Sequence, residues 1–240
     1  MPAVTTTITT TIMTTMITEP ALAALLAWTS PSYPIGGFSY SHGLEAAVEA
    51  GDVTNRATLI DYVAAVMTRG GGWVDLVLFA HGWRAAADET AFDTIAETAA
   101  AFRATSETAL ESRQMGLSFL SVTRNAWPHP GLDHFAARIT GPVAHAAVAA
   151  LAARLHAVPL APALTAFGHA TAANLVSAGV RLVPLGQTDG QIATAALAPI
   201  IAAAITRAQA TDLDDLGTAS PLLEFASLAH ETQYSRLFRS

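Results

Sequence analysis

Residues 32–45 gather aromatic rings, hydroxyls, a histidine and a carboxylate in a chain that is otherwise rich in alanine. Pro34 fixes its own φ, and Gly36 and Gly37 permit backbone angles closed to other residues, so the chain is expected to turn here. Apolar residues recur at helical spacing from Leu44 onward. The segment is therefore predicted to be a shaped loop that leads into a helix, and such loops often carry recognition chemistry.

Nucleophilic catalysis is the first chemistry that this segment suggests, because Ser39 and Ser41 lie close to His42. Side chains adjacent in sequence rarely reach the geometry of a catalytic triad, and the chain contains no G-x-S-x-G motif. The two serines are therefore predicted to cap a helix or to hydrogen-bond within the loop.

A metal hydrolase is the competing enzymatic interpretation. It would use His42 and Glu45 with a distant histidine, either His169 or His230, and it requires these side chains to converge in one concave pocket. A helical small-ligand binder is a third interpretation, and it requires an enclosed apolar pocket instead.

A second polar turn spans residues 184–191 and contains a proline and two glycines. It is predicted to be a corner between two helices, with Asp189 as a cap of the second helix. The amides of Gln187 and Gln191 are suited to fixed hydrogen bonds at such a corner or at an interface.

The tail, residues 230–240, is predicted to order against a partner. Terminal residues are usually frayed, but this tail contains residue types that are enriched at interface hot spots: Tyr234, Arg236, Phe238 and Arg239.

The composition excludes several classes of function. All twelve basic residues are arginine, so the chain has no lysine for a Walker phosphate loop, a pyridoxal Schiff base or a nucleophile. The net charge of -7 argues against broad nucleic-acid binding. The absence of cysteine excludes disulfides and thiolate metal sites, and is consistent with a reducing compartment.

Residues 1–18 are rich in threonine, isoleucine and methionine and have no basic region, so they are predicted to be a flexible leader rather than a signal peptide. Threonines interrupt every window there long enough to cross a membrane. Residues 19–229 are predicted to form one all-α domain of roughly ten helices, because apolar periodicity is helical throughout and sustained alternation is absent. Thr54 is a plausible N-cap of one of these helices.

Three segments together resemble the UreF family of urease accessory proteins, namely residues 33–45, 183–191 and 230–240. Shorter matches at residues 111–116 and 220–224 fall in the same order, and the resemblance runs from about Pro20 to the last residue. The sequence departs from the family at His145, where an aromatic or aliphatic residue is expected.

The resemblance implies a UreF-like, all-α protein that is not an enzyme. It implies a homodimer in the cytoplasm that binds UreD, also called UreH, and recruits the nickel-carrying GTPase UreG to apo-urease for nickel insertion. Those partners would handle nickel and GTP, with no cofactor on this chain and no nucleic acid or membrane involved. It also assigns interface contacts, as hypotheses, to eleven residues: Tyr33, Phe38, Tyr40, His42, Glu45, Gln187, Asp189, Tyr234, Arg236, Phe238 and Arg239.

Overall fold

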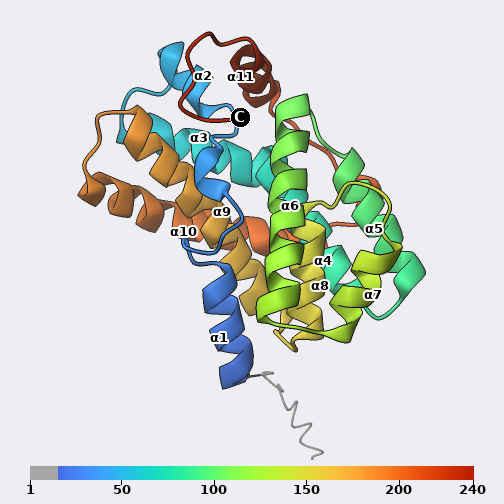
Figure 1. Cartoon of the computed structure of the whole chain (residues 1–240). Coiled ribbons are helices and arrows are strands. Elements are labelled where there is room, and N and C mark those ends of the chain that lie inside the picture. Colours follow the sequence, from blue (N-terminus) through green and yellow to red (C-terminus); the bar gives the residue numbers. More distant parts are fainter. Residues whose placement is uncertain (1–15) are drawn as a thin grey trace, which may run out of the picture.

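The computed structural model describes residues 16–240, which form eleven α-helices, two short 3-10 helices and no strand (Figure 1). This confirms the predicted all-α class. Residues 1–15 of the predicted leader lie outside the described residues. Thr18, near the end of that leader, caps the first helix. The elements are α1 (Glu19–Trp28), η1 (Gly37–Ser39), α2 (Leu44–Glu49), α3 (Arg56–Arg69), α4 (Gly71–Ala85), α5 (Glu89–Ala101), α6 (Ser106–Ala126), α7 (Pro130–Arg138), α8 (His145–Leu155), α9 (Leu160–Leu182), α10 (Gln187–Ala210), η2 (Leu213–Asp215) and α11 (Pro221–Glu231).

Local signals explain most helix starts, with two corrections to the sequence predictions. Asn55, rather than Thr54, is the N-cap of α3, because its side chain accepts hydrogen bonds from the first-turn amides. Helix α10 begins at Gln187, so Asp189 lies within its first turn and does not cap it. Asp189 instead forms an ion pair with Arg56 of α3 at 2.5 Å.

The core is built around α4 and α8. Helix α4 packs on α8, α3, α5, α9 and α10, and eight consecutive residues of α8 are buried, most of them alanines. By length and composition α10 and the α3–α4 segment could cross a membrane. Both pack against other helices of this bundle, and Gly70 separates α3 from α4. The α3–α4 window is 67% buried, as in core helices, whereas that of α10 is 33% buried.

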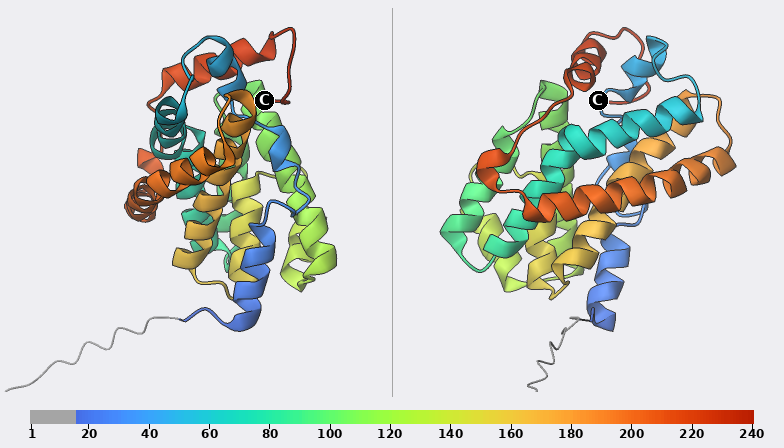
Figure 2. Two further views of the ribbon diagram at one scale, coloured as in Figure 1. Left: turned by 90° about the vertical axis from the view of Figure 1, so that its left-hand side faces the viewer. Right: turned by 180° about the vertical axis from the view of Figure 1, so that it is seen from behind.

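One end of the molecule is formed by α2 and α11, and the chain finishes beside them, whereas α1 lies at the opposite end (Figures 1 and 2). Gly43 allows the close approach of α2 to α11. Its φ of 78° is in the left-handed region, and a Cβ there would lie 2.8 Å from the backbone nitrogen of Ser227. This contact places the start of α2 and the end of α11 around a common buried space.

Candidate partner-docking site

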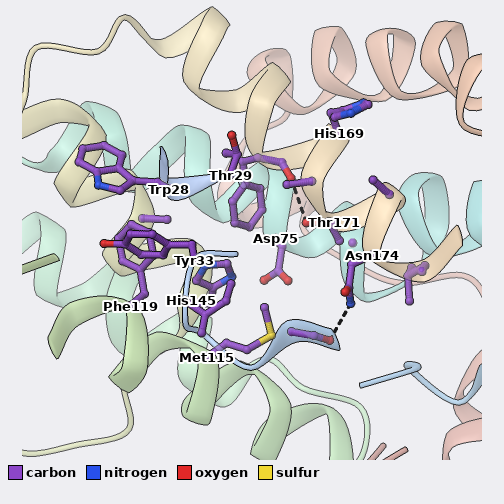
Figure 3. Close-up of a pocket in the computed structure, with 18 of the residues that line it drawn as sticks. Trp28, Thr29, Tyr33, Asp75, Met115, Phe119, His145, His169, Thr171 and Asn174 are labelled. Carbon is purple, nitrogen blue, oxygen red and sulfur yellow. Dashed lines mark hydrogen bonds between the residues drawn. The ribbon is translucent and has the colours of Figure 1, made fainter. Parts of the chain in front are cut away.

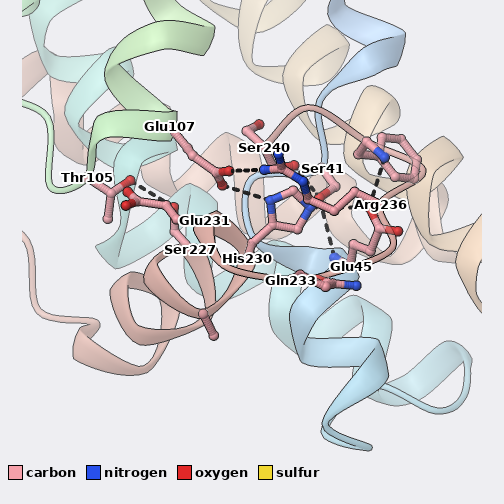
Figure 4. A network of polar contacts seen from close by, with 12 residues as sticks. Ser41, Glu45, Thr105, Glu107, Ser227, His230, Glu231, Gln233, Arg236 and Ser240 are labelled. Atoms are coloured by element: carbon pink, nitrogen blue, oxygen red, sulfur yellow. Dashed lines mark hydrogen bonds and ion pairs between the residues drawn. The ribbon is translucent and has the colours of Figure 1, made fainter.

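The tail, residues 230–240, folds back onto residues 33–45, which we call the first motif. Two segments almost 200 residues apart thus form one site (Figure 4). The Glu45 carboxylate on α2 accepts hydrogen bonds from the backbone N–H groups of Leu237, at 2.7 Å, and Phe238, at 2.8 Å. Glu45 is itself buried. A buried carboxylate needs such donors, and here the donors come from the tail.

A charged cluster lies beneath the tail. His230, at the end of α11, has no exposed surface, and its ring nitrogens lie 2.8 Å from Glu107 and 3.2 Å from Glu45. Arg236 lies 3.0 Å from the other oxygen of Glu107. Helices α2, α6 and α11 and the tail each contribute one charged side chain to this cluster (Figure 4).

The last residues continue the docking along the loop before α2. The N–H of Arg239 donates to the carbonyl of Ser39 at 2.8 Å. Both the N–H and the hydroxyl of Ser41 donate to the carbonyl of Ser240. The Ser240 hydroxyl donates to Glu111 on α6 at 2.9 Å. Ser41 was predicted to cap a helix or to hydrogen-bond within the loop. Its hydroxyl instead donates to the tail, and it accepts from the N–H of Glu45 at 3.3 Å.

Aromatic contacts complete the docking. The Phe238 ring is buried beneath the guanidinium of Arg181, which also donates to the carbonyl of Phe38 at 2.9 Å. Arg239 lies over the ring of Tyr40, whose hydroxyl donates to Gln114 on α6. Burial raises the pKa of the Tyr40 phenol, so the group stays protonated and available as a donor.

The predicted site residues differ in where they lie. Tyr33, Tyr40, Glu45 and Phe238 are buried and support the site from below. Phe38, Tyr234, Arg236 and Arg239 are exposed on or beside the tail.

Tyr33 belongs to an aromatic cluster at the base of the loop. It packs against Phe119 and Trp127, and its hydroxyl hydrogen-bonds to Thr123 at 2.8 Å.

The second polar turn is separate from the tail contacts described above. Asp189 is paired with Arg56 of α3, and Gln187 is an exposed residue at the start of α10. The link from this part of the chain to the tail is Arg181, near the end of α9.

Sequence reasoning missed several residues that make the site. They have no local pattern in common, because each lies on an ordinary helix or in the tail and acts through a partner far away in the sequence: Glu107, Glu111, Arg181, Leu237 and Ser240.

The surface around the tail exposes large apolar side chains. Phe38 is 66% exposed, Leu237 65%, and Tyr234 fully exposed. Leu222, Phe225 and Leu228 of α11 are also 48% exposed or more, and they follow one another at spacings of three along the helix. Contiguous exposed apolar groups of this kind mark interaction surfaces.

The convergence that the hydrolase interpretation requires does not occur. His42 contacts Glu111 and borders a partly open cavity that His169 also lines, whereas Glu45 is bound to the tail and to His230. Among residues 16–240 no cluster of three or more His, Asp or Glu side chains is arranged to hold a metal ion.

The cavity has a volume of about 290 Å³ and lies between the loop after α1 and helices α4, α6, α8 and α9 (Figure 3). Its lining is mixed, with the aromatic rings of Trp28 and Phe119 at one side and Asp75 among the polar groups. A purely apolar ligand pocket, as the third interpretation requires, would not contain the Arg103–Asp75 ion pair, whose closest atoms are 2.6 Å apart.

The pKa values of two histidines in the cavity wall are shifted in opposite directions. Burial would lower the pKa of His42, but the facing Glu111 carboxylate outweighs burial, and the pKa lies above its ordinary value. His145 contacts Phe119 and Phe167, and burial lowers its pKa to about 4. His145 is therefore neutral at neutral pH.

Comparison with known proteins identifies close relatives. The chain matches the UreF family model over residues 53–198. The urease accessory protein UreF of Rhodopseudomonas palustris (strain BisB5) is 49% identical over 222 residues, which cover 92% of this chain and 91% of that protein. The corresponding protein of Bradyrhizobium diazoefficiens is 46% identical over 92% of this chain and 92% of its own length. That of Granulibacter bethesdensis is 47% identical over 92% of this chain and 95% of its own length. Each relative is matched over almost its full length.

Proposed function

Because the chain belongs to the UreF family of urease accessory proteins, we propose that it is a non-catalytic scaffold that acts with UreD to bring the nickel-carrying GTPase UreG to apo-urease. Nickel insertion would then complete the urease metallocentre. In this proposal the protein works in the cytoplasm as a homodimer within the complex, and nickel and GTP are handled by its partners. The chain's own contribution is a docking surface.

The observation that carries the proposal is the composite face made by the first motif and the docked tail. It exposes the apolar side chains of Phe38, Tyr234 and Leu237 together with the arginines Arg236 and Arg239. Aromatic residues and arginine are the types that dominate binding energy at protein interfaces. A tail that served only to close the fold would not need to expose these side chains.

The face divides the predicted residues into two roles. Exposed residues are proposed to touch a partner, and buried or half-buried residues are proposed to hold the face in shape. The contact group comprises Phe38, Tyr234, Arg236 and Arg239, and the supporting group comprises Tyr33, Tyr40, His42, Glu45 and Phe238. Gln187 and Asp189 lie at the α9–α10 corner and are proposed as a separate contact.

The apolar side of α11 extends the surface available to UreD. Leu222 and Phe225 are 79% and 63% exposed, although large apolar groups on a helix are normally turned inward. We assign this side of α11 to UreD, because it is continuous in sequence with the tail. UreG is assigned to the face of the assembled complex.

Co-purification from cells that express the four proteins tests the proposal. Deleting residues 234–240 should abolish recovery of UreD while the helix content by circular dichroism stays nearly unchanged. The sharper variant is Tyr234→Ala with Leu237→Ala, which removes exposed side chains and leaves Phe238 and Ser240 in place. Each such side chain can contribute about 2 kcal/mol, so affinity should fall at least tenfold.

The matched control is Leu117→Ala, which truncates a leucine on α6 that is 49% exposed. It should leave the recovery of UreD and UreG unchanged. Undiminished recovery with the deletion, or nickel-dependent urease activation that does not require this chain, would contradict the proposal.

A further inference from the structure

The partly open cavity between α4, α6, α8 and α9 is lined by oxygen atoms whose hydrogen-bonding capacity is unused. Asp75 on α4 accepts from Arg103 through Oδ1 at 2.6 Å, and its Oδ2 accepts no hydrogen bond among residues 16–240. Asn174 on α9 donates from Nδ2 to the carbonyl of Gly37 at 2.8 Å, which fixes the amide and leaves its Oδ1 without a donor in the described chain. Because buried polar atoms normally have partners, these two oxygens are places where a donor can bind.

His145, at the start of α8, adds a third acceptor to the same lining. Its ring packs against Phe119 and Phe167, and neither ring nitrogen forms a hydrogen bond within the described part of the chain. Burial lowers the pKa of the ring to about 4, so at neutral pH one nitrogen keeps a lone pair. In Figure 3 the Asp75 carboxylate lies between the His145 ring and the Asn174 side chain. Three helices thus supply acceptors to one part of the cavity.

The charges in the lining favour a cation. Asp75 and Glu111 are its carboxylates, and Arg103 is its guanidinium. Arg103 pairs with Asp75, and Glu111 faces Nδ1 of His42 at 3.4 Å. Whenever His42 is neutral, two carboxylates face one guanidinium, so the cavity has an excess of negative charge that attracts a cation.

The other side of the cavity is apolar. The rings of Trp28 and Phe119 meet edge to face with their centres 6.0 Å apart, and Phe79 and Phe167 also line the cavity. The volume of about 290 Å³ is near the lower end for small-ligand pockets. The cavity therefore suits a small ligand with a polar head and a short apolar tail.

We propose that the cavity binds a small organic cation whose primary ammonium group contacts Asp75, Asn174 and His145 and whose apolar tail packs against Trp28 and Phe119. An ammonium group has three N–H donors and no acceptor, which matches the three unused acceptors. A metal ion fits less well, because residues 16–240 contain no group of three His, Asp or Glu side chains arranged to hold one. The proposal is independent of partner docking, so its failure would leave the proposed function untouched.

Methyl NMR of the full chain with carbon-13-labelled methionines tests the site at pH 8, with phenethylamine as the probe. Met115 lines the cavity, whereas Met16 is 84% exposed before α1 and serves as the internal reference. Phenethylamine, a cation at this pH, should shift the Met115 signal saturably in the millimolar range and leave Met16 unchanged. Phenethyl alcohol has the same shape without the charge and should bind at least tenfold more weakly, because hydrogen bonds between charged groups are the stronger ones.

Two substitutions locate the ammonium group. Asp75→Asn keeps the side-chain shape and removes the charge, so the affinity for the amine should fall to that for the alcohol. His145→Phe keeps an aromatic ring between Phe119 and Phe167 and removes the acceptor, so the affinity for the amine should fall roughly fivefold. Asp93→Asn is the matched control, because it disrupts an ion pair with Arg138 at 2.9 Å that lies outside the cavity, and it should change neither affinity.

Three results would overturn the proposal. If Met115 responds to neither compound, the cavity holds only solvent. If the unaltered chain binds the alcohol as tightly as the amine, the ligand is not selected by its charge. If Asp75→Asn keeps the preference for the amine, the carboxylate does not bind the ammonium group. The preference compares two ligands on one protein, so a loss of stability in a variant does not imitate it, and the unaltered chain is decisive even if a variant does not fold.

Discussion

The guanidinium of Arg181 lies 4.4 Å from the centre of the Phe238 ring, and this contact joins the end of α9 to the C-terminal tail. Phe238 is 3% exposed and is the most deeply buried aromatic residue of the tail. The same guanidinium donates to the carbonyl of Phe38. Arg181 thus fixes the position of the loop relative to the tail, although it belongs to neither segment.

Replacing Arg181 with alanine should loosen the tail without unfolding the bundle. A cation–π contact contributes about 0.5–1 kcal/mol at an exposed site and a hydrogen bond about 1 kcal/mol, so the Phe238 amide should exchange roughly tenfold faster. Hydrogen exchange on the isolated chain measures this. Arg154→Ala is the control, since Arg154 lies 4.8 Å from the Trp83 ring on another part of the molecule. Equal effects of the two variants would contradict the assigned role.

The exposed side of α11 should be needed for binding and not for folding. The double substitution Leu222→Ser and Phe225→Ser removes two large apolar groups that are mostly in solvent, so the free energy of unfolding should change by less than about 1 kcal/mol. Affinity for UreD, measured by calorimetry, should fall at least tenfold. Loss of stability with retained affinity would show that α11 serves the fold and not the interface.

Two glycines with the same backbone conformation offer a matched test of the α2–α11 contact. Gly36 and Gly43 have φ of 76° and 78°, but a Cβ at Gly36 would meet no atom within 4 Å, whereas one at Gly43 would strike the backbone of α11. Gly36→Ala should cost about 1–2 kcal/mol of backbone strain in urea unfolding. Gly43→Ala should cost a further 1–3 kcal/mol and should also weaken UreD binding. Equal losses of unfolding free energy in the two variants would contradict the close contact between Gly43 and α11.

His145 should make the protein sensitive to acid. Its pKa is about 4 in the folded protein and 6.5 in the unfolded chain, so the unfolded state binds more protons between these values and stability is lost as pH falls from 6.5 to 4. The loss from this group at pH 5 is about 2 kcal/mol, from the linkage relation. His145→Phe should remove that part of the pH dependence in denaturant titrations at pH 7 and pH 5. His134→Gln, which alters a surface histidine, should leave the pH dependence intact.

The sequence was informative about the helical fold class. Prolines and glycines such as Gly70 and Pro130 mark helix ends by local stereochemistry, which is why the all-α class could be predicted. The start of α10 was placed too late, because Gly186 gives no side-chain cap to recognise.

The burial of Glu45 could not be predicted. Its partners His230 and Leu237 are 185 and 192 residues away, and a pairing of that kind leaves no periodic mark in either segment. The sequence suggested Glu45 only as a candidate for hydrolase chemistry or for an interface contact. The residue types of the loop and tail indicated recognition, whereas their mutual contact depends on the packing of α2 against α11.

One oxygen of Glu111 serves two neighbours, since Oε2 accepts from the Ser240 hydroxyl at 2.9 Å and lies 3.4 Å from Nδ1 of His42. Ser240 belongs to the tail, and His42 borders the partly open cavity. Lifting the tail would remove one donor from that oxygen and leave its negative charge to the histidine alone. A change at the tail would therefore alter the charge that His42 meets at the pocket through a single shared oxygen atom.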